Sequence, residues 1–228
     1  MNIFVVIPAY NEEKAIGQTV SDVRKILAPR SLGEVGCSNI IVVDDGSGDK
    51  TAEAAEVAGA TILRHIVNRG QGAALRTGIN YALAQGADAV VTFDADGQFE
   101  AEEIGKICAP LADGFCDVVL GSRFLTQNKI PFIKRLILAP AIFFTRLLTG
   151  LNLSDTHNGF RAMSRGAAEK INIRQDRMAH SSEIIHEIAR LKLKFKEIPV
   201  TVKYTEYSKR KGQKISGALK ILFDLIMK

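Results

Sequence analysis

Short, continuously apolar segments alternate with stretches of helical periodicity through the first half of this 228-residue chain. The apolar segments are rich in Val and Ile, as is typical of strands that are covered on both faces of a sheet. Regular alternation of such strands with helices predicts a doubly wound, mostly parallel α/β sheet. The predicted strands are Ile3–Ile7, Asn39–Val43, Thr61–Ile66, Ala89–Phe93 and Asp117–Gly121. The predicted helices cover residues 12–28, 49–58, 71–85 and 101–112.

Two helix starts are marked by residues that can cap a first turn. Asp49 precedes a run of Ala and Glu, and Ser181 stands before Glu183 and two isoleucines. Such side chains accept hydrogen bonds from N–H groups of the first turn. We therefore expect helices to begin near Asp49 and Ser181. Glu183 either caps its helix or faces the functional site.

A polar segment follows each predicted strand. These segments are Pro8–Glu13, Asp44–Ser47, Asn68–Gly72, Asp94–Gln98 and Gly121–Arg123. The carboxyl ends of parallel strands lie at one edge of the sheet, where open α/β folds bind ligands. The segments therefore predict one site. The Gly70-Gln-Gly72 segment is no dinucleotide fingerprint, because its third glycine position is Leu75 and it follows the third strand.

Asp94 and Asp96 are separated by one residue directly after a predicted strand. In extended backbone, residues two apart point to the same side, so both carboxylates can converge on one point. Two carboxylates at a strand end suit Mg²⁺ or Mn²⁺ bound together with substrate phosphates. A solvated acidic turn is the alternative interpretation of this short pattern.

Charge is distributed unevenly along the chain, although its net value is only +5. Residues 1–100 carry 8 Lys/Arg and 13 Asp/Glu, whereas residues 101–228 carry 22 and 12. The basic second half indicates an anionic partner, such as a membrane surface or a phosphorylated acceptor. Nucleic acid is the least favoured partner, because no nucleic-acid-binding motif is present and the chain has no Trp.

The cysteines and the N-terminal segment indicate a reducing compartment. The three cysteines, Cys37, Cys108 and Cys116, have no C-x-x-C spacing, which argues against a disulfide framework or a zinc site. The N-terminus lacks the basic region of a signal peptide, so we expect it to form the first strand.

Residues 130–151 are strongly apolar but are interrupted by three basic residues and Pro140. The longest uncharged run, Leu136–Thr145, is too short to cross a bilayer as a helix. Two interpretations remain, a pair of core helices with exposed basic side chains or an amphipathic segment in the membrane interface. The chain then continues with a predicted strand, a basic loop that is either solvated or a phosphate-binding lid, and an amphipathic helix. Their ranges are Phe195–Tyr204, Tyr207–Ile215 and Ser216–Met227.

The ordered set of strand-end segments resembles that of the inverting family 2 glycosyltransferases of GT-A fold, over roughly residues 2–215. It is most similar to the dolichol-phosphate-mannosyltransferase-like branch, which includes bacterial polyprenyl-phosphate glycosyltransferases. The resemblance implies a single GT-A domain (the nucleotide-diphospho-sugar transferase fold) over residues 1–228, with a basic C-terminal extension. Residues 1–122 would bind the nucleotide sugar and the metal, and residues 123–228 would face the acceptor and the membrane.

The resemblance also implies a chemistry, in which a sugar is transferred from a UDP- or GDP-sugar with Mg²⁺ or Mn²⁺ as cofactor. A metal held by two carboxylates would stabilise the charge that develops on the departing nucleoside diphosphate. The residues matched to the nucleoside are Pro8, Tyr10, Glu12 and Asp44. The residues matched to the metal and the diphosphate are Asp94, Asp96 and Gln98. Asp45 points away from Asp44 in a strand, so the two need not share a role, and a capped turn with Ser47 is the structural alternative for both.

On the acceptor side, the segment Asp155–Arg161 resembles the family's Asp-x-x-x-Gly-Phe-Arg segment. The predicted catalytic residues are Asp96, Asp155 and Arg123, with Arg161 as a further candidate. Asp155 would act as a general base, or would orient the acceptor or a basic neighbour. A phosphate acceptor is already ionised at neutral pH and needs no strong base.

Basic residues of the second half could bind an acceptor phosphate, because guanidinium groups form bidentate clamps on such groups. The candidates are Arg123, Lys134, Arg135 and Lys209. The alternative for the lysines is a solvated surface. We expect His157 and His180 to make local hydrogen bonds rather than bind metal.

Many relatives of this branch continue into C-terminal transmembrane helices, whereas this chain stops at Lys228. We therefore expect a cytoplasmic enzyme held peripherally at the inner face of the cell membrane, by residues 130–151, by the basic half or by a membrane-protein partner. The leading hypothesis is inverting transfer of a sugar to a polyprenyl phosphate. One alternative is the same transfer onto a sugar hydroxyl in polysaccharide synthesis, for which Asp155 or Glu183 would be an indispensable base. The other is a non-catalytic nucleotide-sugar-binding subunit of a membrane assembly.

Overall fold

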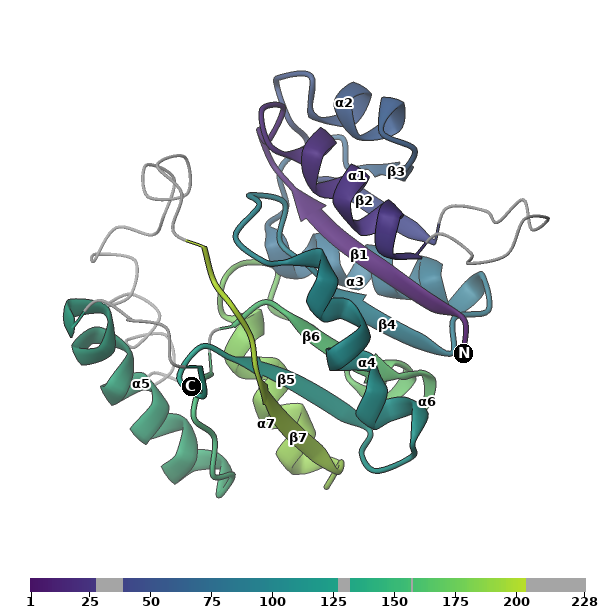
Figure 1. Cartoon of the computed structure of the whole chain (residues 1–228). Helices are drawn as coiled ribbons and strands as arrows, with labels where there is room; N and C mark the ends of the chain where they lie inside the picture. The colour runs from purple at the N-terminus through teal and green to yellow at the C-terminus, as the bar shows by residue number, and fades with distance from the viewer. Residues whose placement is uncertain (28–38, 127–131, 157, 204–228) are drawn as a thin grey trace.

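A seven-stranded sheet forms the centre of the protein in the computed structural model, which describes residues 1–27, 39–126, 132–156 and 158–203 (Figure 1). The strands lie in the order β3-β2-β1-β4-β6-β5-β7. Neighbouring strands are parallel, except that β6 runs antiparallel to both β4 and β5. The doubly wound, mostly parallel sheet is therefore confirmed. The strands are β1 (Ile3–Ala9), β2 (Ile40–Asp44), β3 (Thr61–Arg64), β4 (Ala89–Thr92), β5 (Val118–Ser122), β6 (Arg161–Ser164) and β7 (Phe195–Pro199).

Helices cover both faces of the sheet, and alternate residues of each strand face opposite layers. On one face, Val5 and Ile7 of β1 belong to the same apolar cluster as Ile16 of the first helix. The helices of this face are α1 (Ile16–Leu27), α2 (Thr51–Val57) and α4 (Ile104–Ala112), which the short 3-10 helix η1 (Ala101–Glu103) precedes. On the other face, Val6 of β1 belongs to a second cluster with Leu75. The helices there are α3 (Gln71–Ala84), α6 (Arg165–Lys170) and α7 (His180–Arg190).

The five predicted strands and four predicted helical regions of the first half are all present, with ends shifted by a few residues. The largest differences come later in the chain. The predicted strand Phe195–Tyr204 is shorter in the structure, where β7 ends at Pro199, opposite Ser122 at the end of its partner β5. The helix expected to begin near Ser181 is present, since α7 begins at His180, but Ser181 lies within the first turn and does not cap it.

Of the two interpretations of residues 130–151, the pair of core helices is wrong. One continuous helix, α5 (Phe132–Thr149), contains Pro140 and contacts α7 at the margin of the molecule (Figure 1). Its second half exposes three large apolar side chains. Phe143, Leu147 and Leu148 are 64%, 69% and 56% exposed. Among the helices of the described ranges, none is long and apolar enough to cross a membrane.

Several predictions fall outside the described residues. They concern His157, Lys209, the basic loop Tyr207–Ile215 and the helix Ser216–Met227. The backbone of Lys134 and Arg135 lies in α5, but their side chains are outside the description.

Candidate active site

Hydrogen bonds from backbone to side chain tie the loops after β1 and β2 together. The Asn11 N–H donates to Ser47 Oγ, and the Gly48 N–H donates to Asn11 Oδ1, each over 2.9 Å. The Glu12 N–H donates to Thr51 Oγ1 at the start of α2 over 2.7 Å. Asn11 has a φ of 53°, a left-handed conformation that asparagine tolerates better than most residues. The two loops therefore form one polar rim at the carboxyl edge of the sheet.

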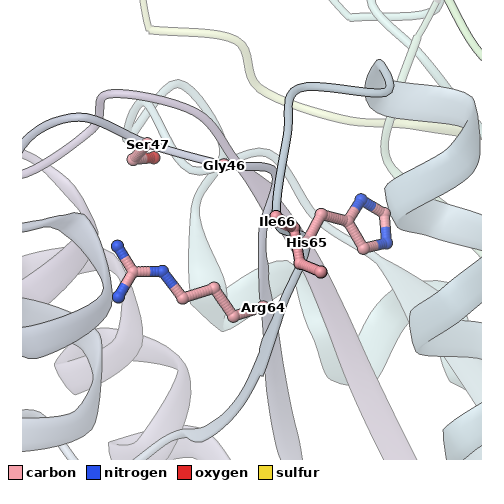
Figure 2. A pocket seen from close by; sticks show the side chains of 5 residues that line it. All are labelled: Gly46, Ser47, Arg64, His65 and Ile66. Carbon is pink, nitrogen blue, oxygen red and sulfur yellow. The ribbon is translucent and has the colours of Figure 1, made fainter.

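A pocket of about 320 Å³ lies where β2 and β3 end (Figure 2). Buried Asp44 underlies it, with Oδ1 accepting from the Ser47 N–H over 2.9 Å, as expected of a capped turn. Its Oδ2 lies 3.1 Å from Arg64 Nε but accepts no hydrogen bond within the described residues. Figure 2 shows the Arg64 side chain and the His65 ring extending to opposite sides of the strand end. The lining residues are Gly46, Ser47, Arg64, His65 and Ile66.

The predicted nucleoside residues are only partly gathered at this pocket. Asp44 contacts two lining residues, Ser47 and Arg64. Pro8, Tyr10 and Glu12 lie on the neighbouring β1 side and do not line it. The buried Asp44 carboxylate is not itself a lining group, but it lies beside the guanidinium of Arg64, which does line the pocket. Convergent polar groups of this kind orient a ligand in a cleft.

The Gly70-Gln-Gly72 segment is explained by close packing. Gly70 has a φ of 106°, and a Cβ there would collide with the backbone oxygen of Asp176. A Cβ at Gly72 would collide with the backbone oxygen of Gln175. The Ala73 N–H also donates to Asp176 O over 3.1 Å. The first turn of α3 is thus seated directly against residues 175–177.

Asp94 and Asp96 stand at the carboxyl end of β4, as predicted. Asp94 Oδ1 accepts from Gln71 Nε2 over 3.2 Å, and Asp96 Oδ1 accepts from the Gln98 N–H over 3.1 Å. Burial and the negative charge of Asp96 raise the pKa of Asp94 to about 7, although the nearby positive charge of Arg161 opposes this rise.

Aromatic packing and one hydrogen bond anchor the residues that flank the two carboxylates. The Phe93 ring contacts the Phe160 ring edge-on at a centroid distance of 5.2 Å and the Phe99 ring at 5.6 Å. Thr19 Oγ1 donates to the Ala95 backbone oxygen over 3.1 Å. The residues on both sides of the Asp-x-Asp segment are therefore anchored in the core, which limits the movement of the two carboxylates.

The carboxylates fit a divalent cation that also binds phosphate oxygens. A Cβ at Gly159 would lie 2.7 Å from Asp94 Oδ2, so the missing side chain leaves room beside the carboxylate. A cation would offset the repulsion between Asp94 and Asp96 that contributes to the raised pKa of Asp94. Within the described residues, no group of three or more His, Cys, Asp or Glu could complete a site made of protein ligands alone. Mg²⁺ commonly uses one or two carboxylates together with substrate phosphates.

Arg123 and Asp155 form an ion pair at the end of β5. Arg123 Nε donates to Asp155 Oδ2 over 2.7 Å, and the side chain of Asp155 is buried. Arg161 of β6 is 2% exposed, and its Nη1 and Nη2 donate no hydrogen bond within the described ranges. Burial lowers the pKa of Arg161 to about 10, while Asp94 and Asp155 act against this change. Arg161 is thus a buried positive charge that interacts with Asp94 of the Asp-x-Asp segment and with Asp155 of the ion pair.

Glu197 of β7 fixes the segment that carries Asp155. Its carboxylate accepts from the Ser154 N–H over 2.8 Å and from the Asp155 N–H over 3.1 Å. Ser154 Oγ also lies 2.6 Å from Ser122 Oγ. Glu197 and Gln71 belong to no motif of the sequence, because each acts on a residue far along the chain. Only the neighbouring glycines of Gln71 drew attention to its segment.

Glu183 and His180 have local structural contacts. Glu183 Oε2 accepts from the N–H groups of Arg174 and Gln175 over 2.9 and 2.8 Å, so it holds the segment that packs on α3. Buried His180 is hydrogen-bonded through Nδ1 to the backbone oxygen of Arg177 over 2.9 Å, as expected of a structural histidine. Neither contact is to the residues of the Asp-x-Asp segment.

Comparison with known proteins identifies the class of this enzyme. The sequence profile of glycosyl transferase family 2 matches residues 4–172. The chain belongs to this family and is a glycosyltransferase.

Its relatives include enzymes that act on polyprenyl phosphates. The chain is 42% identical to protein MJ1222 of Methanocaldococcus jannaschii, over 99% of this chain and 91% of that protein. It is 32% identical to a UDP-N-acetylglucosamine–dolichyl-phosphate N-acetylglucosaminyltransferase of Methanococcus voltae, over 99% of this chain and 95% of the relative. The second of these relatives supports the polyprenyl-phosphate branch of the family.

The fold is also that of solved glycosyltransferases. Glucosyl-3-phosphoglycerate synthase of Mycobacterium tuberculosis, solved with Mg²⁺ and uridine diphosphate, superposes with a TM-score of 0.70 at 20% identity. The match covers 98% of this chain and 78% of the synthase. The GT-A fold is therefore confirmed.

Proposed function

We propose that the protein transfers a sugar from a nucleotide diphosphate sugar to a polyprenyl phosphate, with inversion at the anomeric carbon and with Mg²⁺ or Mn²⁺ as cofactor. One observation carries this proposal. The carboxylates of Asp94 and Asp96 at the end of β4 are electrostatically linked, through buried Arg161, to the Arg123–Asp155 pair at the end of β5. This transfer requires a metal-diphosphate site and an anion site close to each other, and only β6, which carries Arg161, lies between β4 and β5 in the sheet.

The donor nucleoside would bind on the β1–β2 side of the site. Asp44 Oδ2 is a buried acceptor that lacks a hydrogen-bond donor in the described chain, and Arg64 lies beside it. An N–H of uracil or guanine would supply that donor, while the ring carbonyls would accept from the guanidinium. Half-exposed Tyr10 and the neighbouring Pro8 and Glu12 would contact the nucleoside from the rim.

The diphosphate would bind at the Asp-x-Asp segment. Asp94, Asp96 and Gln98 would hold the metal, which as a Lewis acid would stabilise the negative charge of the departing nucleoside diphosphate. Gln71 and Arg161 would hold Asp94 in place, one through a hydrogen bond and the other through its charge. In this division, residues 1–122 serve the donor and residues 123–228 serve the acceptor, within one domain.

The acceptor is proposed to be a phosphate rather than a hydroxyl. An oxygen of the acceptor phosphate attacks the anomeric carbon, and the bond from that carbon to the donor phosphate breaks. The electron pair leaves with the nucleoside diphosphate, so no proton has to be removed from the acceptor. Arg123 would bind the acceptor phosphate, and Asp155 would orient the Arg123 guanidinium.

The contacts of the two candidate bases favour this choice. Asp155 Oδ2 already accepts from Nε and from the backbone N–H of Arg123, over 2.7 and 3.2 Å. Glu183 accepts from two backbone N–H groups of residues 174–175. Transfer to a sugar hydroxyl would need one of these carboxylates as a base. Both carboxylates already have structural hydrogen bonds, so this second function is the less supported one.

Peripheral membrane contact is part of the proposal. The exposed apolar side chains Phe143, Leu147 and Leu148 of α5 could enter the interface of a bilayer, with exposed Arg146 toward lipid headgroups. This contact would place the enzyme at the cytoplasmic face of the cell membrane, alone or together with a membrane-protein partner.

A transfer assay tests the proposed function. The purified protein is incubated with labelled UDP- and GDP-sugars, undecaprenyl phosphate in detergent, and Mg²⁺ or Mn²⁺. We expect metal-dependent label in the lipid fraction, and we expect Asp96→Ala to abolish it while Asp117→Asn, at the opposite edge of the sheet, retains it. Metal-dependent release of nucleoside diphosphate without a lipid product would favour a hydroxyl acceptor. Nucleotide binding without any turnover would favour a non-catalytic subunit.

A further inference from the structure

Asp45 makes an unusually complete set of contacts to the loop between β3 and α3. Its Oδ1 lies 2.6 Å from His65 Nδ1 and accepts from the Arg69 N–H over 3.0 Å. Its Oδ2 accepts from the Gly70 N–H over 2.6 Å. Asp45 is 3% exposed, so these bonds are shielded from water. One buried carboxylate therefore holds both ends of the loop, at His65 and at residues 69–70.

The imidazole extends this network into α3. Because the Asp45 carboxylate can only accept, His65 Nδ1 is the donor of their hydrogen bond. His65 Nε2 lies 3.0 Å from Thr77 Oγ1 of α3, which completes the pairing of the ring. The loop is thereby fixed both to the end of β2 and to the helix that follows it.

Close packing against neighbouring backbone also confines the loop between β3 and α3. Gly46, next to Asp45, approaches the backbone of Val67, and a Cβ there would lie 2.6 Å from the carbonyl carbon. Gly70 packs against Asp176, which Arg76 of α3 also binds through an ion pair of 2.8 Å. Residues 69–70 are therefore confined between Asp45 and residues 175–177.

The next residue in the chain reaches the Asp-x-Asp segment. Gln71 is the first residue of α3, and its Nε2 donates to Asp94 Oδ1 over 3.2 Å. Arg69 and Gly70, whose N–H groups donate to Asp45, immediately precede Gln71 in the chain. A continuous series of short contacts thus runs from Asp45, through two backbone N–H groups and the Gln71 side chain, to Asp94.

We infer that Asp45 is a positioning residue for the donor diphosphate and its metal, because it places the Gln71 amide against Asp94 through the backbone of Arg69 and Gly70. The inference rests on the proposed function. It separates the two neighbouring aspartates by role. Asp44 contacts Ser47 and Arg64, which line the proposed nucleoside pocket, whereas Asp45 acts on the metal-binding carboxylate without touching the ligand.

A double-mutant cycle tests this inference. Binding of UDP and of GDP, each with Mn²⁺, is measured by calorimetry for the wild type, Asp45→Asn, Gln71→Ala and the double variant. Loss of a group that orients a metal ligand typically weakens binding 10- to 100-fold. We expect each single variant to weaken binding by about tenfold. The double variant should bind no more weakly than the more damaging of the two single variants. Independent residues would instead give the product, about a hundredfold.

Two controls separate positioning from general loss of stability. Asp117→Asn removes a carboxylate that likewise accepts a distant backbone N–H, that of Lys194 over 2.8 Å, but lies at the opposite edge of the sheet. It should leave binding unchanged. Amide hydrogen exchange of residues 65–72 should rise in Asp45→Asn but not in Gln71→Ala. Asp45→Ser, which keeps an acceptor oxygen, replaces Asp45→Asn in the cycle if the latter does not fold.

The outcomes distinguish the two proposals. Wild-type protein that binds neither nucleotide overturns the proposed function, and the positioning role with it. Binding by the wild type with a multiplicative double variant, or with unchanged hydrogen exchange in Asp45→Asn, overturns only the positioning role. Nucleotide binding that is weakened equally by Asp117→Asn also overturns the positioning role, because the loss of binding would then reflect lower stability of the fold.

Discussion

Arg123 binds one oxygen of Asp155 twice, through Nε over 2.7 Å and through its backbone N–H over 3.2 Å. The pair joins the end of β5 to a segment 32 residues further along the chain. Because Asp155 is buried and Arg123 is partly accessible, the carboxylate fixes the direction in which the guanidinium can meet an anion. The pair is therefore better suited to binding an acceptor phosphate than to removing a proton.

Asp155→Asn should release the Arg123 side chain and lower kcat/KM for transfer by about 100-fold, the loss typical of removing one transition-state donor. Steady-state kinetics over a range of pH checks this. The shape of the pH–rate profile should stay unchanged, since no base has been removed. Loss of an acidic limb from that profile would contradict the electrostatic role and would identify Asp155 as a base.

Gly159→Ala should weaken Mn²⁺ binding at least tenfold, because the new Cβ would lie 2.7 Å from Asp94 Oδ2 and displace the carboxylate. Electron paramagnetic resonance of free Mn²⁺ in the presence of nucleotide measures the change. Gly166→Ala is the matched control, since a Cβ there meets nothing within 4 Å. Equal binding by the two variants would show that Asp94 does not hold the metal.

Stability of the metal-free protein should depend on the charge of Asp94. Burial and Asp96 raise the pKa of Asp94 from 3.8 to about 7, so the folded protein binds a proton that the unfolded chain has lost. Stability should therefore fall as the pH rises from about 4 to about 7, and the loss is complete above that window. Asp94→Asn does not titrate, so its Tm relative to wild type should rise over the same window.

Thermal unfolding of both proteins in EDTA measures this difference. Added Mn²⁺ with nucleotide should raise the Tm of the wild type at neutral pH but not that of Asp94→Asn, because a cation favours the charged carboxylate. A Tm difference that is the same at about pH 4 and about pH 8 would contradict the raised pKa.

Leu147→Glu/Leu148→Glu should reduce binding to phosphatidylglycerol vesicles at least tenfold, because two exposed leucines of α5 would no longer enter the bilayer. Unfolding should change by no more than about 0.5 kcal/mol per substitution, as expected of exposed sites. Val57→Glu, at an 88% exposed residue of α2, is the control. Vesicle sedimentation that is equal for all three proteins would exclude α5 as the membrane contact.

Local patterns were sufficient to predict much of the fold. The Val- and Ile-rich runs that became β1, β2, β4 and β5 are buried on both faces, so composition alone identifies them. Strand β6 was missed, because its four residues include Arg161 and its place between β4 and β5 depends on distant pairing. The segment that forms α5 had two interpretations, since an apolar run with Pro140 does not reveal how much of it will be exposed.

The candidate site was predicted where its chemistry lies in short motifs. Asp94 and Asp96 are recognisable from their spacing after a strand, and Arg123 and Asp155 from their segments. Gln71 and Glu197 are not recognisable, because their partners are 23 and 43 residues away and only the folded chain brings them together. The roles of these residues toward ligands remain predictions.

The most direct test of the central claim compares two acceptors that differ only in the phosphate. Sugar transfer is measured in one assay to undecaprenyl phosphate and to undecaprenol, with the same labelled donor and Mn²⁺, and the anomeric configuration of the product is determined by NMR. We predict a product only with undecaprenyl phosphate, with the anomeric configuration opposite to that of the donor. Equal transfer to undecaprenol, or a product with retained configuration, would contradict the proposed inverting transfer to a phosphate.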